Sequence, residues 1–266
     1  MKTKQIIVIL ITIIILSGCS AKEDYGVFLG LDNSNLEIFT FYDTVVIDAQ
    51  YFSKEDVEFL HENDVKVLSY LNVGSIENFR DYYEDFEYLT LGIYENWEEE
   101  KWVDVSVQEW QDFICGTIAK EIYEKGIDGF FVDNCDVYYN YNNEEIYQGL
   151  VNILGNISNY DKDVVINGGD KFVARYIEEN AGISGVLTGI NQEEVFSTYD
   201  FNAGISSKSS DEEREYYQNY IDKCSRLGAD VYLIEYTNDI KIIKEVEKYC
   251  NKRGFKYYIA DSIELN

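Results

Sequence analysis

The chain has 266 residues and a formal net charge of −28, because 50 acidic residues face 22 basic ones. This charge repels nucleic acid and anionic surfaces, so we expect no nucleic-acid partner and favour a neutral or cationic one; the alternative is that the charge only keeps the protein soluble. The single histidine, His61, and the absence of any C-x-x-C pair among five cysteines exclude a histidine-rich or zinc centre, and we expect no metal and no cofactor.

The first predicted element is an export signal. Lys2 and Lys4 precede an apolar run over residues 6–16, which is too short for a comfortable membrane span. The following Leu-Ser-Gly-Cys resembles a bacterial lipobox with Cys19 as the lipidated residue, and the alternative is an uncleaved anchor helix. We expect a lipoprotein signal peptide over 1–18, a short tether over 19–23 and one domain over 24–266, with the protein anchored outside the cytoplasm at the bacterial cell membrane.

Short apolar segments alternate with amphipathic ones through the rest of the chain. The segments predicted as strands are 25–31, 44–50, 65–73, 129–133, 163–167, 184–190, 230–236 and 256–261. The segments predicted as helices are 54–63, 106–125, 143–158, 171–180, 209–227 and 239–252. Strands separated by helices indicate a parallel sheet, and eight such units favour a (β/α)8 barrel, because doubly wound sheets usually have fewer strands.

Polar residues recur where the predicted strands end, which is the rim that holds the active site in such barrels. Some of them are poor helix caps, so capping alone does not explain the pattern. We therefore expect a site formed by these residues, with Asp48, Tyr70, Glu235 and Tyr236 as candidates for substrate binding. The complete set is Asp48, Tyr70, Asn72, Asp133, Asn167, Gln192, Glu193, Glu235, Tyr236 and Asp261.

A rim of carboxylates without a histidine partner is typical of glycosidic bond cleavage, which needs two carboxyl groups on either side of the sugar. Asp133, at the end of the apolar strand "GFFVD", is the first candidate. Its partner is Glu193 or the adjacent Glu194, since neighbouring side chains on a strand point to opposite sides. Asp128 precedes the strand and should lie at the opposite rim, while Asp136 either binds substrate or caps the next helix.

Three segments carry a resemblance to a known family: "YDTVVIDAQYFSKEDVEFLHENDVKVLSYLNVGSIENFR" (42–80), "WVDVSVQEW" (102–110) and "GIDGFFVDNCDVY" (126–138). They resemble glycoside hydrolase family 114, whose members look like (β/α)8 barrels acting as endo-α-1,4-polygalactosaminidases. The resemblance implies that Asp133 is the catalytic aspartate, as nucleophile or base, and Glu193 the catalytic acid/base. It also implies that three residues shape the site: Tyr70, Arg80 and Asp136. The chain departs from the family on the first strand, where Tyr25 and Phe28 stand in place of a tryptophan.

The expected function is that of a surface-anchored glycoside hydrolase that cleaves galactosamine-containing polysaccharide, a substrate that is cationic wherever its amine is free. Trp97 and Trp102, in the long connection after the third strand, could stack on sugar rings or pack the rim. A non-catalytic carbohydrate-binding lipoprotein and a glycosidase for another amino-sugar polymer are the alternatives. A solute-binding lipoprotein would need two lobes instead of eight continuous units. The sequence leaves open whether the anomeric configuration is retained or inverted.

Overall fold

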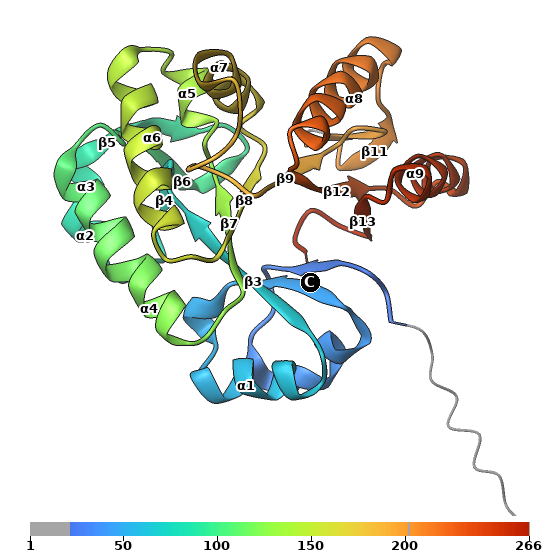
Figure 1. Ribbon diagram of the computed structural model, residues 1–266, viewed down its shortest axis with the longest axis horizontal. Coiled ribbons are helices and arrows are strands. Elements are labelled where there is room, and N and C mark those ends of the chain that lie inside the picture. The colour runs from blue at the N-terminus through green and yellow to red at the C-terminus, as the bar shows by residue number, and fades with distance from the viewer. Residues whose placement is uncertain (1–21, 202, 266) are drawn as a thin grey trace, which may run out of the picture.

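A nearly closed barrel of eight parallel strands forms the centre of the computed structural model, which describes residues 22–201 and 203–265 (Figure 1). Each strand is hydrogen-bonded to the next in the order β1-β2-β3-β7-β8-β9-β12-β13. Their bounds are β1 Gly26–Phe28, β2 Thr44–Ile47, β3 Lys66–Asn72, β7 Gly129–Asp133, β8 Asp163–Asn167, β9 Gly189–Glu193, β12 Asp230–Tyr236 and β13 Lys256–Ala260. The first and last strands lie side by side, since the rings of Phe28 and Tyr258 are 5.6 Å apart. The predicted fold class is thus confirmed, whereas the signal peptide and Cys19 lie outside the described residues.

Helices surround the strands (Figure 1). The sequence signals for their starts are present, because Ser53 and Ser210 each form a capping box at the start of α1 and α8. The α-helices are α1 Lys54–Glu62, α2 Tyr83–Phe86, α3 Gln108–Phe113, α4 Ala119–Glu124, α5 Val137–Asn140, α6 Glu144–Ser158, α7 Asp170–Asn180, α8 Asp211–Arg226 and α9 Ile240–Arg253. Shorter helical segments are η1 Asn33–Phe41, η2 Ala49–Tyr51, η3 Glu87–Leu89 and the π-helix η4 Ile114–Ile118, which joins α3 to α4.

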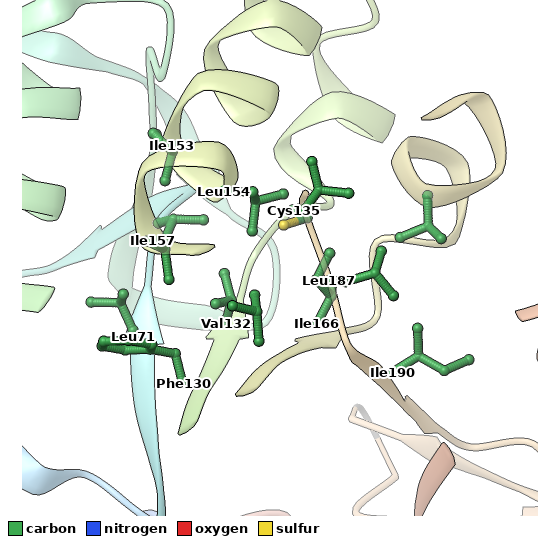
Figure 2. Packing of buried hydrophobic residues seen from close by; sticks show 14 of the residues in the cluster. Leu71, Phe130, Val132, Cys135, Ile153, Leu154, Ile157, Ile166, Leu187 and Ile190 are labelled. Carbon is green, nitrogen blue, oxygen red and sulfur yellow. The ribbon is translucent and has the colours of Figure 1, made fainter. Parts of the chain in front are cut away.

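The alternation of side chains along each strand separates two apolar cores. On β7, Phe130 and Val132 point outward into the core that also contains Leu154 and Ile157 of α6 (Figure 2). Phe131 points inward and belongs to the core inside the barrel. Because successive residues alternate, Asp133 is on the same inward side as Phe131. The apolar strand thus directs its terminal aspartate into the mouth of the barrel.

The sixth strand differs from its prediction over 184–190. In the structure β9 spans Gly189–Glu193, and the apolar residues before it form a turn. Gly185 has a φ of +87°, which is left-handed and interrupts an extended run. Val186 and Leu187 are buried in the outer core without belonging to a strand. These two residues are apolar because they pack under the helices. The strand itself begins later and ends at Glu193.

Two additions to the barrel carry extra strands that the sequence analysis did not predict. Between β3 and α3 lies an antiparallel sheet of β4 (Ser75–Glu77), β6 (Trp97–Val103) and β5 (Thr90–Tyr94). After β9 follows a hairpin of β10 (Ser197–Asp200) and β11 (Ile205–Lys208). Trp97 of the first addition contacts Phe201 of the second, with ring centroids 6.1 Å apart. The connections that extend the barrel therefore meet each other.

At the end of the barrel where the strands begin, polar residues hold the structure together. His61 on α1 lies 3.0 Å from Asp128, and the same carboxylate accepts a hydrogen bond from the backbone of Val67 on β3. This agrees with the expectation that Asp128 lies away from the site.

Four buried cysteines of the described chain are free: Cys115, Cys135, Cys224 and Cys250. Over the described ranges, no helix is both long and apolar enough to cross a membrane.

Candidate active site

A cavity of 620 Å³ opens at the carboxyl ends of the strands, within the size range of ligand sites. Its wall is strongly acidic, and among the described residues that line it Arg80 is the single basic one. Such a wall favours cations and disfavours anions. The acidic residues of the wall are Asp32, Asp48, Glu77, Glu99, Glu100, Asp133, Glu193 and Glu264.

Asp133 and Glu193 meet in this cavity through one shared nitrogen. The side-chain Nδ2 of Asn167, at the end of β8, donates to Asp133 Oδ1 at 2.9 Å and to Glu193 Oε1 at 2.8 Å. Since both distances end on one atom, these two carboxylate oxygens are less than about 6 Å apart. Two acidic residues far apart in the sequence thus face each other across a gap of the size that glycosidases use.

The amide of Asn167 is held in place by a further chain of hydrogen bonds. Its Oδ1 accepts from Asn191 Nδ2 at 2.7 Å, and Asn191 Oδ1 in turn accepts from the hydroxyl of Tyr25 at 3.3 Å. Asn167 and Asn191 come from the neighbouring strands β8 and β9, whereas Tyr25 precedes β1 and reaches Asn191 from the core inside the barrel. The bridge between the two carboxylates is therefore positioned by buried groups, which fixes its orientation before any substrate binds.

The backbone after Asp133 is shaped to hold that side chain. Asn134 adopts a left-handed φ of +66°, and its N–H donates to Asp133 Oδ1 at 2.9 Å. The carbonyl of Asn134 packs against Gly74, where an added Cβ would lie 1.8 Å from the carbonyl oxygen. Gly74 belongs to the "GSIE" stretch after β3. Only glycine permits this approach, so the turn after β3 packs directly against the turn that follows β7.

The two carboxyls interact electrostatically. Burial, together with the charge of Glu193, raises the pKa of Asp133 from its usual range to about 8. Two like charges this close do not both ionise readily, so the pair holds one proton between them at neutral pH. One proton donor and one ionised carboxylate are what the cleavage of a glycosidic bond requires.

Glu193 faces the cavity, and Glu194 does not line it. Tyr236, at the end of β12, donates its hydroxyl to Glu193 Oε2 at 2.7 Å. Glu194 has a left-handed φ of +57° and accepts a hydrogen bond from the backbone of Tyr199 in the hairpin. Of the two adjacent glutamates, Glu193 is the one that shares the cavity with Asp133.

A buried ion cluster forms another part of the wall. Arg80 donates to Asp48 Oδ2 at 2.8 Å and to Glu77 Oε1 at 2.9 Å, and these three side chains are 3–7% exposed. Tyr70 lies beside the cluster, with its hydroxyl 3.5 Å from Glu77. Desolvation raises the pKa of Asp48 even though Arg80 acts in the other direction. Tyr70, Arg80 and Asp48 thus line the cavity, as does Tyr236.

Two predicted substrate-binding residues lie elsewhere, which corrects those expectations. Glu235 is fully buried on the outward side of β12, one residue before inward Tyr236, and accepts hydrogen bonds from the backbone of Phe196 and Ser197. It anchors the loop after β9. Asp136 accepts from the N–H of Gly169, just before α7, and is not part of the cavity wall. Both residues hold loops, and neither faces the cavity.

Three residues of the cavity wall were not predicted from the sequence: Glu77, Glu100 and Tyr94. Glu77 and Glu100 lie on the added sheet, whose strands were not predicted, and the run "WEEEKW" resembles an ordinary solvent-exposed charged segment. The Glu of the "GSIE" stretch was the one available signal. Trp97 lines the cavity, whereas Trp102 is buried and stacks on Tyr94 with ring centroids 4.1 Å apart.

Fold and site together define a barrel with a paired-carboxylate centre of the kind found in glycoside hydrolases. Residues 24–263 match the family described as "Glycoside-hydrolase family GH114". The chain belongs to this family, as the sequence motifs predicted.

Individual relatives are more distant. A protein of Methanocaldococcus jannaschii, MJ1477, is 25% identical over 79% of this chain, which spans about two thirds (65%) of that relative's length. The glycoside hydrolase domain of PelA from Pseudomonas aeruginosa superimposes with a TM-score of 0.77 at 16% identity, covering 91% of this chain and 95% of that one. Ega3 of Aspergillus fumigatus, solved in complex with galactosamine, gives a TM-score of 0.69 at 16% identity, covering 92% of each chain.

Proposed function

We propose that this protein hydrolyses α-1,4-linked polymers of galactosamine and N-acetylgalactosamine, with Asp133 and Glu193 as the reacting carboxyls. The observation that carries the proposal is the shared nitrogen of Asn167, which brings the two carboxylates together inside the cavity. Membership of family GH114 supports the reaction class. The acidic wall supports a substrate with free amines, and galactosamine is the sugar bound in the Ega3 structure.

The separation of the carboxylates favours retention of the anomeric configuration. Retaining glycosidases place the two groups about 5–5.5 Å apart, whereas inverting ones leave about 6.5–9.5 Å for a water molecule. The first step then forms a bond between the anomeric carbon and one carboxylate, while the other carboxyl gives its proton to the departing sugar oxygen. In the second step, that carboxylate takes a proton from water, and the resulting hydroxide displaces the enzyme from the sugar.

The roles of the two carboxyls can be assigned in two ways. The family resemblance implies that Asp133 attacks and Glu193 transfers the proton. The pKa of Asp133, about 8, instead places the proton of the empty site on Asp133, which is the state of an acid. Because the proton belongs to the pair, the binding of substrate can relocate it. Rescue of the Asp133 and Glu193 variants by azide separates the two assignments.

The direct test of the activity is to incubate the protein from residue 20 onward with purified galactosaminogalactan, chitosan and peptidoglycan glycan. We expect oligosaccharides from galactosaminogalactan, detected by mass spectrometry. Release from chitosan alone would redirect the proposal to another amino-sugar polymer. If no polymer is cut while binding is retained, the chain is a carbohydrate-binding protein and the hydrolase proposal is wrong.

The shared proton predicts a fall in activity at alkaline pH. Below about pH 8 the pair retains its proton and can protonate the leaving oxygen, and above that pH both carboxyls are ionised and the acid is lost. We expect kcat/KM to decrease about tenfold per pH unit above pH 8. The measurement should use a fully N-acetylated substrate, whose charge does not change with pH, and thermal unfolding at each pH should verify the fold. A constant rate up to pH 10 would contradict this prediction.

We further propose that the protein is anchored to the outside of the bacterial cell membrane through a lipid on Cys19, on the basis of the lipobox-like sequence alone. The full chain expressed in bacteria should partition into the detergent phase of a Triton X-114 extraction, and Cys19→Ser should move it to the aqueous phase. Equal partition of the two proteins would contradict the anchor at Cys19. Retention of both in the detergent phase would indicate an uncleaved anchor helix instead.

A further inference from the structure

Glu100 is a carboxylate of the cavity wall with one oxygen fully engaged and the other open. Its Oε1 accepts from Asn72 Nδ2 at 2.8 Å and from Asn134 Nδ2 at 2.9 Å, and the hydroxyl of Ser75 also contacts it. Its Oε2 accepts no hydrogen bond from any described residue. This oxygen is also not one of the buried side-chain atoms that lack a partner. The network therefore fixes the side chain and leaves Oε2 available in the cavity.

No basic side chain of the described residues forms an ion pair with Glu100. Glu77 stands directly opposite it in the antiparallel pairing of β4 with β6, and like charges in such positions repel each other. Arg80, the basic side chain of the wall, forms its ion pairs with Glu77 and Asp48. Burial, followed by the charge of Glu77, raises the pKa of Glu100 to about 7. A cation bound beside Glu100 would relieve both the desolvation and the repulsion.

Glu77 is paired with Arg80 through Oε1, but its other oxygen also lacks a donor. Its side chain is 6% exposed and lines the cavity, and its Oε2 is buried without a hydrogen-bond partner among the described residues. Rotation about the terminal torsion of a glutamate is broad, so either oxygen can turn toward a ligand. A buried acceptor that lacks a donor is costly, and a donor on a bound ligand would remove that cost.

Glu100 also adjoins the reacting pair. Asn134 donates its side-chain amide to Glu100 and its backbone N–H to Asp133 Oδ1, so one residue contacts both carboxylates. A sugar ring held at Asp133 therefore has Glu100 within reach of its substituents. Chemical groups on that ring, and not a distant part of the polymer, are what Glu100 can recognise.

We propose that Glu100 Oε2 binds the ammonium group of a de-N-acetylated amino sugar, with Glu77 on the other side of that group, and that this contact makes the enzyme select free-amine units over N-acetylated ones. This inference rests on the proposed hydrolase function and specifies its substrate. A hydroxyl would satisfy the hydrogen bond and leave the negative charges uncompensated. An acetamide would bring a methyl group and no charge.

The test compares Glu100→Gln with Glu98→Gln. Glutamine keeps an acceptor for Asn72 and Asn134 and removes the charge, so the fold and network should persist. Glu98 is exposed on the same strand and is not part of the cavity wall, so its variant removes an equal charge from solvent. Binding is measured by calorimetry in an Asp133→Asn background, with oligomers of galactosamine and of N-acetylgalactosamine. Hydrolysis of both oligomers is measured in the otherwise unchanged protein.

We expect Glu100→Gln to weaken binding of the galactosamine oligomer about 10- to 100-fold, to leave the N-acetylated oligomer unaffected, and to lose most of the salt dependence. Glu98→Gln should change neither affinity by more than about twofold. Equal losses for both oligomers, or none for either, would overturn the role of Glu100 while leaving the hydrolase intact. A protein that binds galactosamine through Glu100 and cuts nothing would keep this inference and refute the proposed function.

Discussion

Asp133→Asn and Glu193→Gln should each lower kcat/KM for galactosaminogalactan by about 10²- to 10⁴-fold, which is the usual contribution of one positioned acid or base. Both substitutions keep the size of the side chain and an acceptor for the amide of Asn167, so the cavity should keep its shape. Substrate binding should survive in both variants. The assay is release of reducing ends, with affinity measured separately by calorimetry.

Glu194→Gln is the matched control, because it removes a neighbouring carboxylate that does not line the cavity. We expect its activity to stay within a few-fold of the unchanged protein. A loss as large as that of Glu193→Gln would mean that the wrong glutamate has been assigned. Full activity of Asp133→Asn would refute the two-carboxylate mechanism outright.

Azide distinguishes the nucleophile from the acid in these same variants. With an activated α-galactosaminide, azide can attack in place of the missing carboxylate. A variant without the nucleophile yields the β-glycosyl azide, while a variant without the acid forms the enzyme adduct first and yields the α-azide. A β-azide from Asp133→Asn supports the role that the family resemblance implies. An α-azide from that variant supports the role that the raised pKa of Asp133 implies.

The second large effect concerns stability. Arg80→Met should lower the free energy of unfolding by about 3–5 kcal/mol, because it leaves Asp48 and Glu77 as two buried carboxylates without their cation. Urea denaturation at neutral pH measures the loss. We expect the deficit to shrink as the pH falls, since protonation neutralises carboxylates whose burial is uncompensated.

Lys120→Met is the control for Arg80→Met. Lys120 and Glu124 form an exposed pair at 3.8 Å on one helix, and such pairs contribute little. Its unfolding free energy should change by less than about 0.5 kcal/mol. If Arg80→Met were equally mild, the ion cluster would have no structural role, and the positions of Asp48 and Glu77 would need another explanation.

Much of the barrel follows from local sequence pattern, because each strand is a short apolar run bounded by an amphipathic helix. The position of Asp133 was predictable for the same reason, since period-2 alternation from Phe131 places it inward. The same rule separates Tyr236 from Glu235, but applying it requires knowing which residue of each run faces the barrel axis. In runs that are apolar on both sides, composition does not contain that information.

Other parts of the site depend on contacts between distant segments. Glu100 belongs to a strand that exists because it pairs with β4 and β5, and its own segment is too charged to suggest a strand. The turn before β9 looked like a strand because its apolar side chains pack under helices. Tertiary packing determines both the strand that carries Glu100 and the turn before β9. Such contacts between distant segments cannot be predicted from the local sequence.

The bridging amide of Asn167 is followed by Gly168, and an Asn-Gly pair in a mobile chain readily loses ammonia when the glycine nitrogen attacks the side-chain carbonyl. Here the Gly168 N–H donates to the carbonyl of Asn191 at 3.0 Å, and the Asn167 side chain is held on three sides. The folded structure thus protects Asn167 from deamidation. Each episode of unfolding exposes it, and conversion to aspartate would set a third negative charge between the reacting carboxyls. Heat inactivation would then become permanent through the loss of a single amide.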